Sequence, residues 1–198
     1  MRLHFLRHAE SVANAGLKSQ FGEGDQLSPH GLDQAEAIVE TLLQSGYDKI
    51  YVSPSLRTLQ TITPYLRRSN QRATILPICS EIPSALEMIK NLLGKKRPKT
   101  LKIPEIYQDL FVPHPRFTTP PMRGESLLDV TERLKCFESY LLGSYGNTHT
   151  SLLLVSHGRF GRELIQRLIG RPVSHPENAG LWKMKGSTRP FTLESEKD

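Results

Sequence analysis

Short apolar runs alternate with longer amphipathic stretches along this chain, and that alternation constrains its fold more than any other feature. Four runs have the length of buried strands, at residues 2–6, 49–52, 73–78 and 151–155. Strands that alternate with helices are typical of a parallel sheet with crossover helices. The sequence therefore predicts an α/β fold, with a mostly parallel central sheet and helices on both of its faces.

Helical periodicity is strongest in two of the amphipathic stretches. In the first, Ser28 and Pro29 suit the start of a helix, apolar residues then recur at helical spacing, and Gly46 suits its end. In the second, residues 125–142, apolar residues form one stripe and the opposite face is charged. Both stretches are predicted to be helices that pack on the sheet.

The size of the chain favours one domain. A length of 198 residues allows a substantial core but rarely two domains, so we expect a single domain over residues 1–198.

The longest aliphatic run, residues 152–155, is far too short for a membrane span, and His4 and Arg7 interrupt the apolar N-terminus, unlike a signal peptide. We therefore expect a cytoplasmic location and no membrane partner. Cys79 and Cys136 form no C-x-x-C pair, which argues against a disulfide framework or a thiolate metal site.

Residues 83–123 differ in composition from the rest of the chain. They hold seven of the 14 prolines, and eight bases against three acids give them a net charge of +5 out of +6 for the whole chain. We interpret this segment as a lid or insertion, whose positive charge suits either an anionic ligand or a solvated face. The acidic residues 194–198 are predicted to form a frayed tail.

Polar side chains follow each predicted strand at the point where it ends. The open edge of an α/β sheet, beyond the carboxyl ends of its strands, is where such folds build their sites. Arginine presents paired donors to phosphate oxygens, and neutral imidazole is a competent nucleophile at phosphorus, so this set predicts phosphoryl transfer. The residues concerned are Arg7 and His8, Ser53 and Arg57, Ser80 and Glu81, and Ser156 and His157. No carboxylate cluster suited to Mg²⁺ accompanies them, so no metal and no cofactor are expected.

These residues lie in motifs that resemble the histidine phosphatase (phosphoglycerate mutase-like) superfamily. L-R-H-A-E-S-V-A-N at residues 6–14 resembles its R-H-G signature, with Ala9 in place of the glycine. The resemblance continues in order through L-S-P-H-G-L-D-Q-A at 27–35, S-P-S-L-R-T-L-Q-T at 53–61, G-E-S at 124–126 and V-S-H-G at 155–158. It therefore spans most of the chain and implies the phosphoglycerate mutase-like fold.

The resemblance also implies roles for individual residues. His8 occupies the position of the phosphorylated histidine, so it is implied as the nucleophile. The residues implied to bind the phosphoryl group with it are Arg7, Asn14, Arg57, His157 and Gly158. His8, Arg7, Arg57 and His157 are also implied as catalytic, because cationic and donor groups stabilise the charge on the equatorial oxygens of the transition state.

The leaving oxygen of an ester needs a proton, and the resemblance implies an acid soon after the third strand. Many family members have a G-x-W-E-G element there, whereas this chain has I-P-S-A-L-E at residues 82–87, so Glu81 and Glu87 compete for the role. We favour Glu81 because it lies nearer the end of the strand.

Several other polar residues have structural explanations. His30 is interpreted as a partly exposed helical residue, and His114 and Arg116 as residues of an exposed loop that could also touch substrate. Ser53 either contacts phosphate or caps the following helix. Arg159 either lines the pocket or points to solvent from a helix N-terminus.

Three functions follow, in decreasing order of preference. The first is a metal-independent phosphate monoester hydrolase that acts through a phosphohistidine on a small anionic phosphorylated metabolite. The second is a phosphoglycerate mutase-type transfer, in which the phosphoryl group returns to bound substrate. The third is a non-catalytic module that binds a phospho-ligand or RNA, although nucleic acid is not favoured as a partner. Specificity is expected to lie in residues 83–123, and the sequence leaves the substrate and the oligomeric state open.

Overall fold

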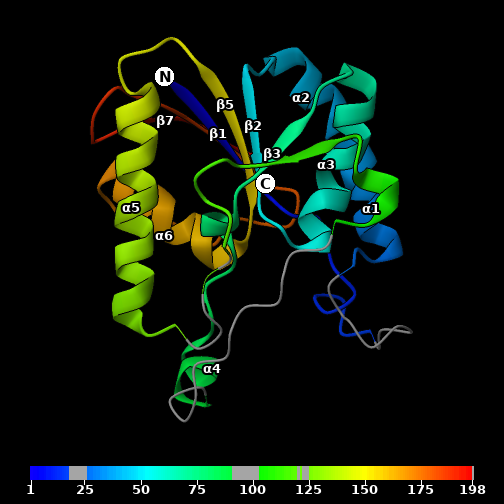
Figure 1. Ribbon diagram of the computed structural model, residues 1–198, viewed down its shortest axis with the longest axis horizontal. Coiled ribbons are helices and arrows are strands. Elements are labelled where there is room, and N and C mark those ends of the chain that lie inside the picture. The colour runs from blue at the N-terminus through cyan, green and yellow to red at the C-terminus, as the bar shows by residue number, and fades with distance from the viewer. Residues whose placement is uncertain (18–25, 91–102, 120, 122–124, 198) are drawn as a thin grey trace.

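A computed structural model of the chain describes residues 1–17, 26–90, 103–119, 121 and 125–197. Within these residues, seven strands form one sheet in the order β4-β3-β2-β5-β1-β6-β7 (Figure 1). The strands are β1 (Arg2–Arg7), β2 (Lys49–Val52), β3 (Ala73–Ile75), β4 (Phe111–Pro113), β5 (Ser151–Ser156), β6 (Leu181–Lys185) and β7 (Thr192–Lys197). β1 to β5 pair in parallel, whereas β6 and β7 are antiparallel to their neighbours, so the predicted mostly parallel sheet is confirmed.

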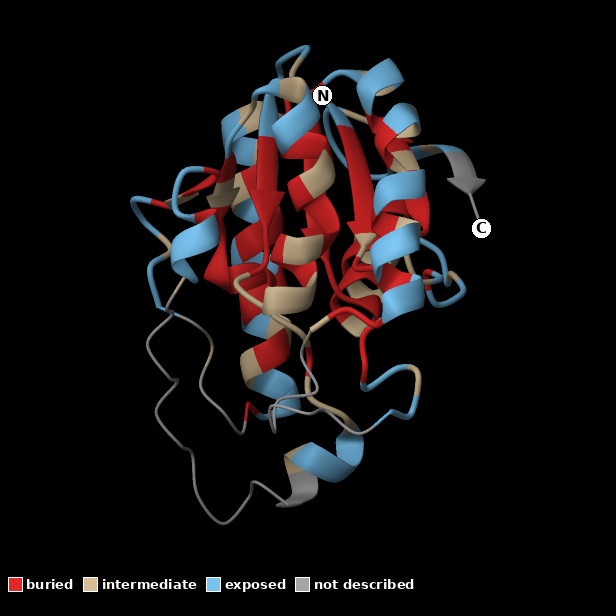
Figure 2. Cartoon of the chain, turned by 90° about the vertical axis from the view of Figure 1, so that its right-hand side faces the viewer, coloured by how far each residue is buried: buried red, intermediate tan, exposed pale blue. Residues whose placement is uncertain are grey.

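Helices cover both faces of this single α/β domain. They are α1 (Pro29–Ala37), α2 (Val39–Ser45), α3 (Leu56–Ser69), α4 (Ala85–Lys90), α5 (Leu127–Tyr145) and α6 (Gly158–Ile169). The side chains of β1 alternate between two cores, since Phe5 packs with α5 and α6 while Leu6 packs with α2 and α3. Every residue of β5 is buried, as expected for a central strand covered on both faces. Figure 2 shows buried strands between helices with exposed outer surfaces.

Local sequence signals explain where the helices begin. At α1, the Ser28 side chain accepts a hydrogen bond from the Gly31 amide, and Pro29 occupies the first turn. At α5, Ser126 and Asp129 form a reciprocal capping box. The single helix predicted between Ser28 and Gly46 is two consecutive helices, α1 and α2, which meet at Ile38.

The predicted third strand is shorter than expected. β3 ends at Ile75, and a 3₁₀ turn at Pro77–Cys79 follows where residues 76–78 were predicted to remain extended. Pro77 starts this turn because its fixed φ suits a helical first position and it offers no amide to a strand ladder.

The prediction that residues 83–123 form a lid or insertion is wrong for their central part. β4 lies in this segment and extends the sheet beside β3, and a 3₁₀ turn at Glu105–Tyr107 precedes it. Tyr107, Leu110 and Phe111 are buried in the core that also holds α2 and α3. These apolar residues therefore make residues 107–113 part of the domain, while residues 91–102, 120 and 122–124 lie outside the described residues.

The expected frayed tail is also wrong for residues 194–197. They belong to β7, which pairs antiparallel with β6 with a register shift at Lys183/Met184. Backbone hydrogen bonds to β6 thus order a segment whose acidic composition suggested a free end; Asp198 lies outside the described residues.

Over the described ranges, no helix combines the length and apolar character needed to cross a bilayer.

Candidate active site

The carboxyl ends of the central parallel strands open onto one polar cavity. It has a volume of about 280 Å³ and is lined by Arg7, His8, Ser11, Ala13, Asn14, Arg57, Glu81, Arg159 and His175. β1 delivers Arg7 and His8, the first turn of α3 after β2 delivers Arg57, and the segment after β3 delivers Glu81. The structure therefore brings together, in the lining of this cavity, four of the eight side chains that the strand-end pattern singled out.

His8 is buried, and a hydrogen bond fixes which of its ring nitrogens carries the proton. Nδ1 lies 2.7 Å from the carbonyl oxygen of Ala9. A carbonyl only accepts, so Nδ1–H is the donor and Nε2 keeps its lone pair. Burial is the main cause, and the Arg57 charge the next, of a pKa of His8 that is lowered to about 3. The hydrogen bond to Ala9 raises this pKa, but by less. The ring is therefore neutral at physiological pH.

Arg7 and Arg57 place two partly buried guanidinium groups beside His8. Arg7 Nη1 donates to the Pro176 carbonyl at 2.8 Å. Its Nε is buried and, within the part of the chain that the structure describes, has no hydrogen-bond partner. Burial lowers the pKa of both arginines, because removal from water penalises the charged form. A buried cationic donor of this kind needs an acceptor, and an anion in the cavity would supply one.

His157 supports the cavity from behind and is not among its lining residues. It is fully buried; its Nδ1 accepts from Arg57 Nη2 at 3.0 Å, and its Nε2 lies 2.7 Å from the Ser53 hydroxyl. Because guanidinium only donates, Nδ1 is the acceptor and Nε2–H donates to Ser53. Burial, with a further contribution from Arg57, lowers the pKa of His157 well below its ordinary value. A direct contact of His157 with phosphate stays a prediction; in this structure its ring orients Arg57.

Ser53 does not cap the following helix, and its hydroxyl accepts a hydrogen bond from His157; a contact of Ser53 with phosphate stays a prediction. The residue at the start of α3 is Ser55, which makes no side-chain cap hydrogen bond.

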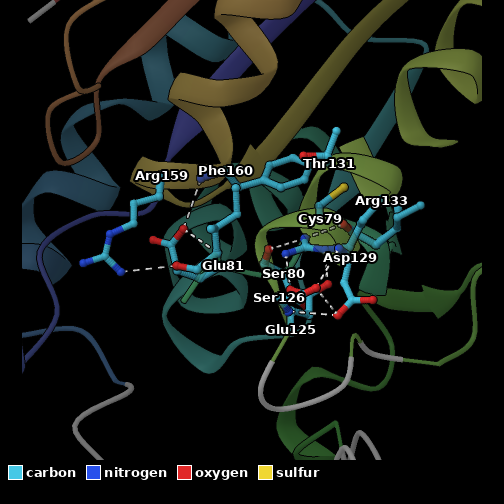
Figure 3. Close-up of polar contacts among 12 residues, drawn as sticks. Cys79, Ser80, Glu81, Glu125, Ser126, Asp129, Thr131, Arg133, Arg159 and Phe160 are labelled. Atoms are coloured by element: carbon cyan, nitrogen blue, oxygen red, sulfur yellow. Dashed lines mark hydrogen bonds and ion pairs between the residues drawn. The ribbon is translucent and has the colours of Figure 1, made fainter. Parts of the chain in front are cut away.

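The structure separates the two candidate acids. Glu81 lines the cavity, and its Oε1 accepts from the backbone amides of Ile82 at 2.9 Å and Phe160 at 3.1 Å (Figure 3). Glu87 is exposed on α4, where its Oε2 accepts from the Ser84 amide, and it does not line the cavity. The position of Glu81 agrees with the preference for it, and its role as the acid stays a prediction.

Asn14 and Gly158 complete the set of predicted phosphate-binding residues. Asn14 lines the cavity, and its Oδ1 accepts from the Ser11 hydroxyl at 3.0 Å and from Asn178 at 3.3 Å, which orients its amide. Gly158 begins α6 but is not among the lining residues. A Cβ there would overlap the His175 ring and lie 3.2 Å from Arg7 Nε, so only glycine allows these side chains to pack so closely.

Sequence reasoning missed His175 as a lining residue. It follows α6 in an irregular R-P-V-S-H-P stretch with neither periodicity nor a strand end to mark it. Arg159, left open by the sequence, also lines the cavity and donates to the Ile82 carbonyl at 3.2 Å.

The remaining polar candidates lie elsewhere. His114 is buried instead of exposed, bonded to the Tyr140 hydroxyl at 3.0 Å and accepting from the Arg116 and Phe117 amides. His30 is exposed beside Gln34. Among the residues placed by the structure, no group of three or more His, Cys, Asp or Glu side chains is arranged to hold a metal ion.

Three solved structures illustrate the likeness of this fold to known proteins. The α-ribazole phosphatase from Shigella flexneri gives a TM-score of 0.69 at 20% identity, covering 100% of this chain and 96% of that one. A mycobacterial glucosyl-3-phosphoglycerate phosphatase, in complex with VO₃, gives a TM-score of 0.65 at 20% identity, covering 98% of this chain and 97% of that one. The phosphoserine phosphatase from Entamoeba histolytica, in complex with 3-phosphoglyceric acid, gives a TM-score of 0.65 at 21% identity, covering 100% of this chain and 96% of that one. At these identities the likeness shows a shared fold.

Sequence comparison identifies the family. No curated protein matches the chain. The profile of the histidine phosphatase superfamily (branch 1), however, matches residues 3–196, which confirms the resemblance seen in the motifs. The chain belongs to branch 1 of the histidine phosphatase superfamily.

Proposed function

We propose that this chain hydrolyses phosphate monoesters through a phosphohistidine on His8. One observation carries the proposal: His8 is neutral, its Nδ1–H is engaged by Ala9, and it lines the same cavity as Arg7 and Arg57. Nucleophilic catalysis needs an unprotonated nitrogen, and this geometry leaves Nε2 as that atom. The family to which the chain belongs is named for histidine phosphatases, which is in keeping with this chemistry.

In the first step, Nε2 of His8 attacks the phosphorus and the bond from phosphorus to the ester oxygen breaks. Arg7 and Arg57 bind the phosphoryl oxygens, where charge is spread in the transition state. Glu81 donates a proton to the departing oxygen, which leaves as an alcohol. Both backbone donors to Glu81 reach Oε1, so Oε2 carries that proton.

In the second step, water attacks the phosphohistidine. The Glu81 carboxylate takes a proton from this water, the bond from phosphorus to Nε2 breaks, and orthophosphate leaves. His8 returns to its neutral form with Nδ1–H still donating to Ala9, and Glu81 is again protonated. The two steps therefore restore every group to its starting state.

The cavity suits a compact, anionic ester. Among the residues that the structure describes, its lining includes three arginines, Arg7, Arg57 and Arg159, against one carboxylate, Glu81. Apart from two histidines, these described lining residues include no aromatic ring on which a nucleobase could stack. Two structurally similar proteins are named as phosphatases of phosphoserine and of glucosyl-3-phosphoglycerate, small esters that also carry a carboxylate. We propose a substrate of this class.

A panel of phosphate esters tested in the presence of EDTA checks this proposal. Orthophosphate should be released from small carboxylated esters at the same rate with and without the chelator. Isomerisation of phosphoglycerate, followed in parallel, should be negligible, because a mutase would return the phosphoryl group to bound substrate. Loss of hydrolysis in EDTA would contradict the metal-independent mechanism, and isomerisation faster than hydrolysis would show a mutase.

A further inference from the structure

The residue proposed as the acid lies on an irregular segment. Between β3 and α4, the described chain forms only the 3₁₀ turn Pro77–Cys79, and Glu81 follows it without regular structure. A group that transfers a proton must be held within a few tenths of an ångström of its productive position. The segment therefore needs support from elsewhere in the fold.

Three consecutive carbonyls just before Glu81 accept hydrogen bonds from side chains of other elements. Arg133 Nη1, on α5, donates to the carbonyls of Ile78 at 2.9 Å and Ser80 at 2.7 Å. The Ser156 hydroxyl, at the end of β5, donates to the carbonyl of Cys79 at 2.6 Å. Figure 3 shows the Arg133 guanidinium directed at this turn. The backbone that leads into Glu81 is thus fixed to α5 and β5.

Arg133 is itself held by a buried carboxylate. Its Nε and Nη2 donate to Glu125 Oε1 at 2.8 Å and Oε2 at 2.7 Å, and the two side chains are 7% and 6% exposed. Glu125 directly precedes Ser126, whose capping box with Asp129 fixes the start of α5. Apolar residues often replace such a buried pair with no loss of stability, so the pair is weak evidence for a purely stabilising role.

Phe160 connects the same pair to the carboxyl group of Glu81. Its ring lies under the Arg133 guanidinium, 5.6 Å from ring centre to Cζ. Its backbone amide donates to Glu81 Oε1 at 3.1 Å. Arg133 therefore supports both the backbone before Glu81 and the residue that binds its side chain.

We propose that Glu125 and Arg133 are positioning residues for Glu81, which hold its carboxyl group in the cavity. Neither is among the residues that line the cavity, so both act through the turn and through Phe160. This inference rests on the proposed function, in which Glu81 is the proton donor.

The test compares an alkyl phosphate with p-nitrophenyl phosphate, whose leaving anion needs no proton. Arg133→Lys keeps the charge but loses the planar fork that reaches two carbonyls and a carboxylate together. In this variant and in Glu125→Gln, kcat/KM for the alkyl ester should fall on the order of tenfold more than kcat/KM for the aryl ester. Glu81→Gln should show the same selectivity. Hydrogen exchange at the Ile82 amide, a donor to Glu81, should become faster in both variants.

Glu138→Gln is the matched control. Glu138 is also on α5, its side chain is also 6% exposed, and its ion-pair partners, Arg167 at 2.8 Å and Arg189 at 2.6 Å, lie outside the Glu81 segment. This variant should leave the ratio of alkyl to aryl activity and the Ile82 exchange rate unchanged. A ratio that falls equally in the control and in Arg133→Lys would reduce the pair to a general stabilising role.

A double variant, Glu125→Gln with Arg133→Met, covers the case in which a single change prevents folding. It removes both charges, so no unpaired charge stays buried. It should fold and still show the selective loss; full alkyl activity in this variant would overturn the positioning role. If Glu81→Gln itself shows no selectivity, the assignment of the acid fails and the positioning role falls with it. If Glu81→Gln is selective and the Glu125 and Arg133 variants are not, only the positioning role is overturned.

Discussion

At the scale of single residues, the site depends on two imidazoles in opposite tautomers. The ring centroids of His8 and His157 are 5.3 Å apart. The Ala9 carbonyl, which only accepts, places the His8 proton on Nδ1, whereas Arg57, which only donates, places the His157 proton on Nε2. One ring thus leaves Nε2 unprotonated, as the proposed nucleophile requires, and the other binds Arg57 and Ser53.

Nuclear magnetic resonance of the imidazole nitrogens tests this arrangement. His8 should carry its proton on Nδ1 and His157 on Nε2. Since burial lowers the pKa of His8 to about 3 and that of His157 well below its ordinary value, neither ring should titrate between about pH 5 and about pH 8. A ring that gains a proton near pH 6.5, or two rings in the same tautomer, would contradict the assignment.

How far residues could be predicted depends on where they lie in the chain. Arg7 and His8 stand at the end of β1, and Glu81 follows the third predicted apolar run, so the sequence periodicity itself points to the open edge of the sheet. His175 reaches the cavity from an irregular stretch, and the Ser53 hydroxyl binds His157, because tertiary packing decides both contacts. Spacing along the chain carries no information about such contacts.

At the scale of elements, α6 approaches β1 closely through a glycine. A Cβ on Gly161, in the first turn of α6, would overlap the ring of Phe5, which is fully buried. The same turn begins at His157 and Gly158, so this close packing sets the distance between α6 and the cavity.

Alanine substitution at two helical glycines tests the packing of α6. Gly161→Ala should destabilise the fold by about 1–3 kcal/mol, because the added methyl group displaces Phe5. Gly143→Ala, on an exposed part of α5 where a Cβ meets nothing within 4 Å, should instead stabilise it by about 0.5–1 kcal/mol. Urea unfolding measures both; equal effects of the two changes would show that α6 does not need the glycine.

The elements themselves were predicted unevenly. β5 holds the continuous apolar run L-L-L-V and β2 the run I-Y-V, as suits buried parallel strands, whereas His4 interrupts the apolar residues of β1. β4 is three residues long and ends in proline, and the composition of its surroundings suggested a lid. β6 and β7 were not predicted, because as antiparallel strands at the sheet edge they mix apolar and charged residues, as in L-W-K-M-K. β6 is placed in the sheet by its pairing with β1 and β7 by its pairing with β6, and periodicity reports neither pairing.

At the scale of the whole molecule, burying neutral histidines makes stability depend on pH. His8 has a folded-state pKa of about 3 and His4, beside Tyr47, one of about 4, in both cases chiefly because of burial. Both lie below the ordinary value of 6.5, so at acid pH the unfolded chain binds more protons than the folded one. Their contribution to stability is complete above about pH 6.5 and is lost as the pH falls toward these folded-state values.

The free energy of unfolding should therefore fall by a few kcal/mol between about pH 7 and about pH 4, measured by urea titration at each pH. His8→Asn should flatten this dependence, because it removes one of the histidines whose pKa burial lowers. His30→Asn, at an exposed position, is the control and should retain the wild-type profile. A wild-type stability that is constant over this range would show that the histidines are not buried as neutral groups.

Trapping the phosphoenzyme tests the central claim most directly. Wild-type protein mixed with ³²P-labelled ester and quenched in alkali should carry one base-stable, acid-labile label, located on His8 by peptide mapping. In His8→Ala, which should keep its folded state, the label should be absent and turnover abolished. A wild-type enzyme that turns over with no labelled His8, or a His8→Ala variant that keeps a tenth of the activity, would contradict the phosphohistidine mechanism.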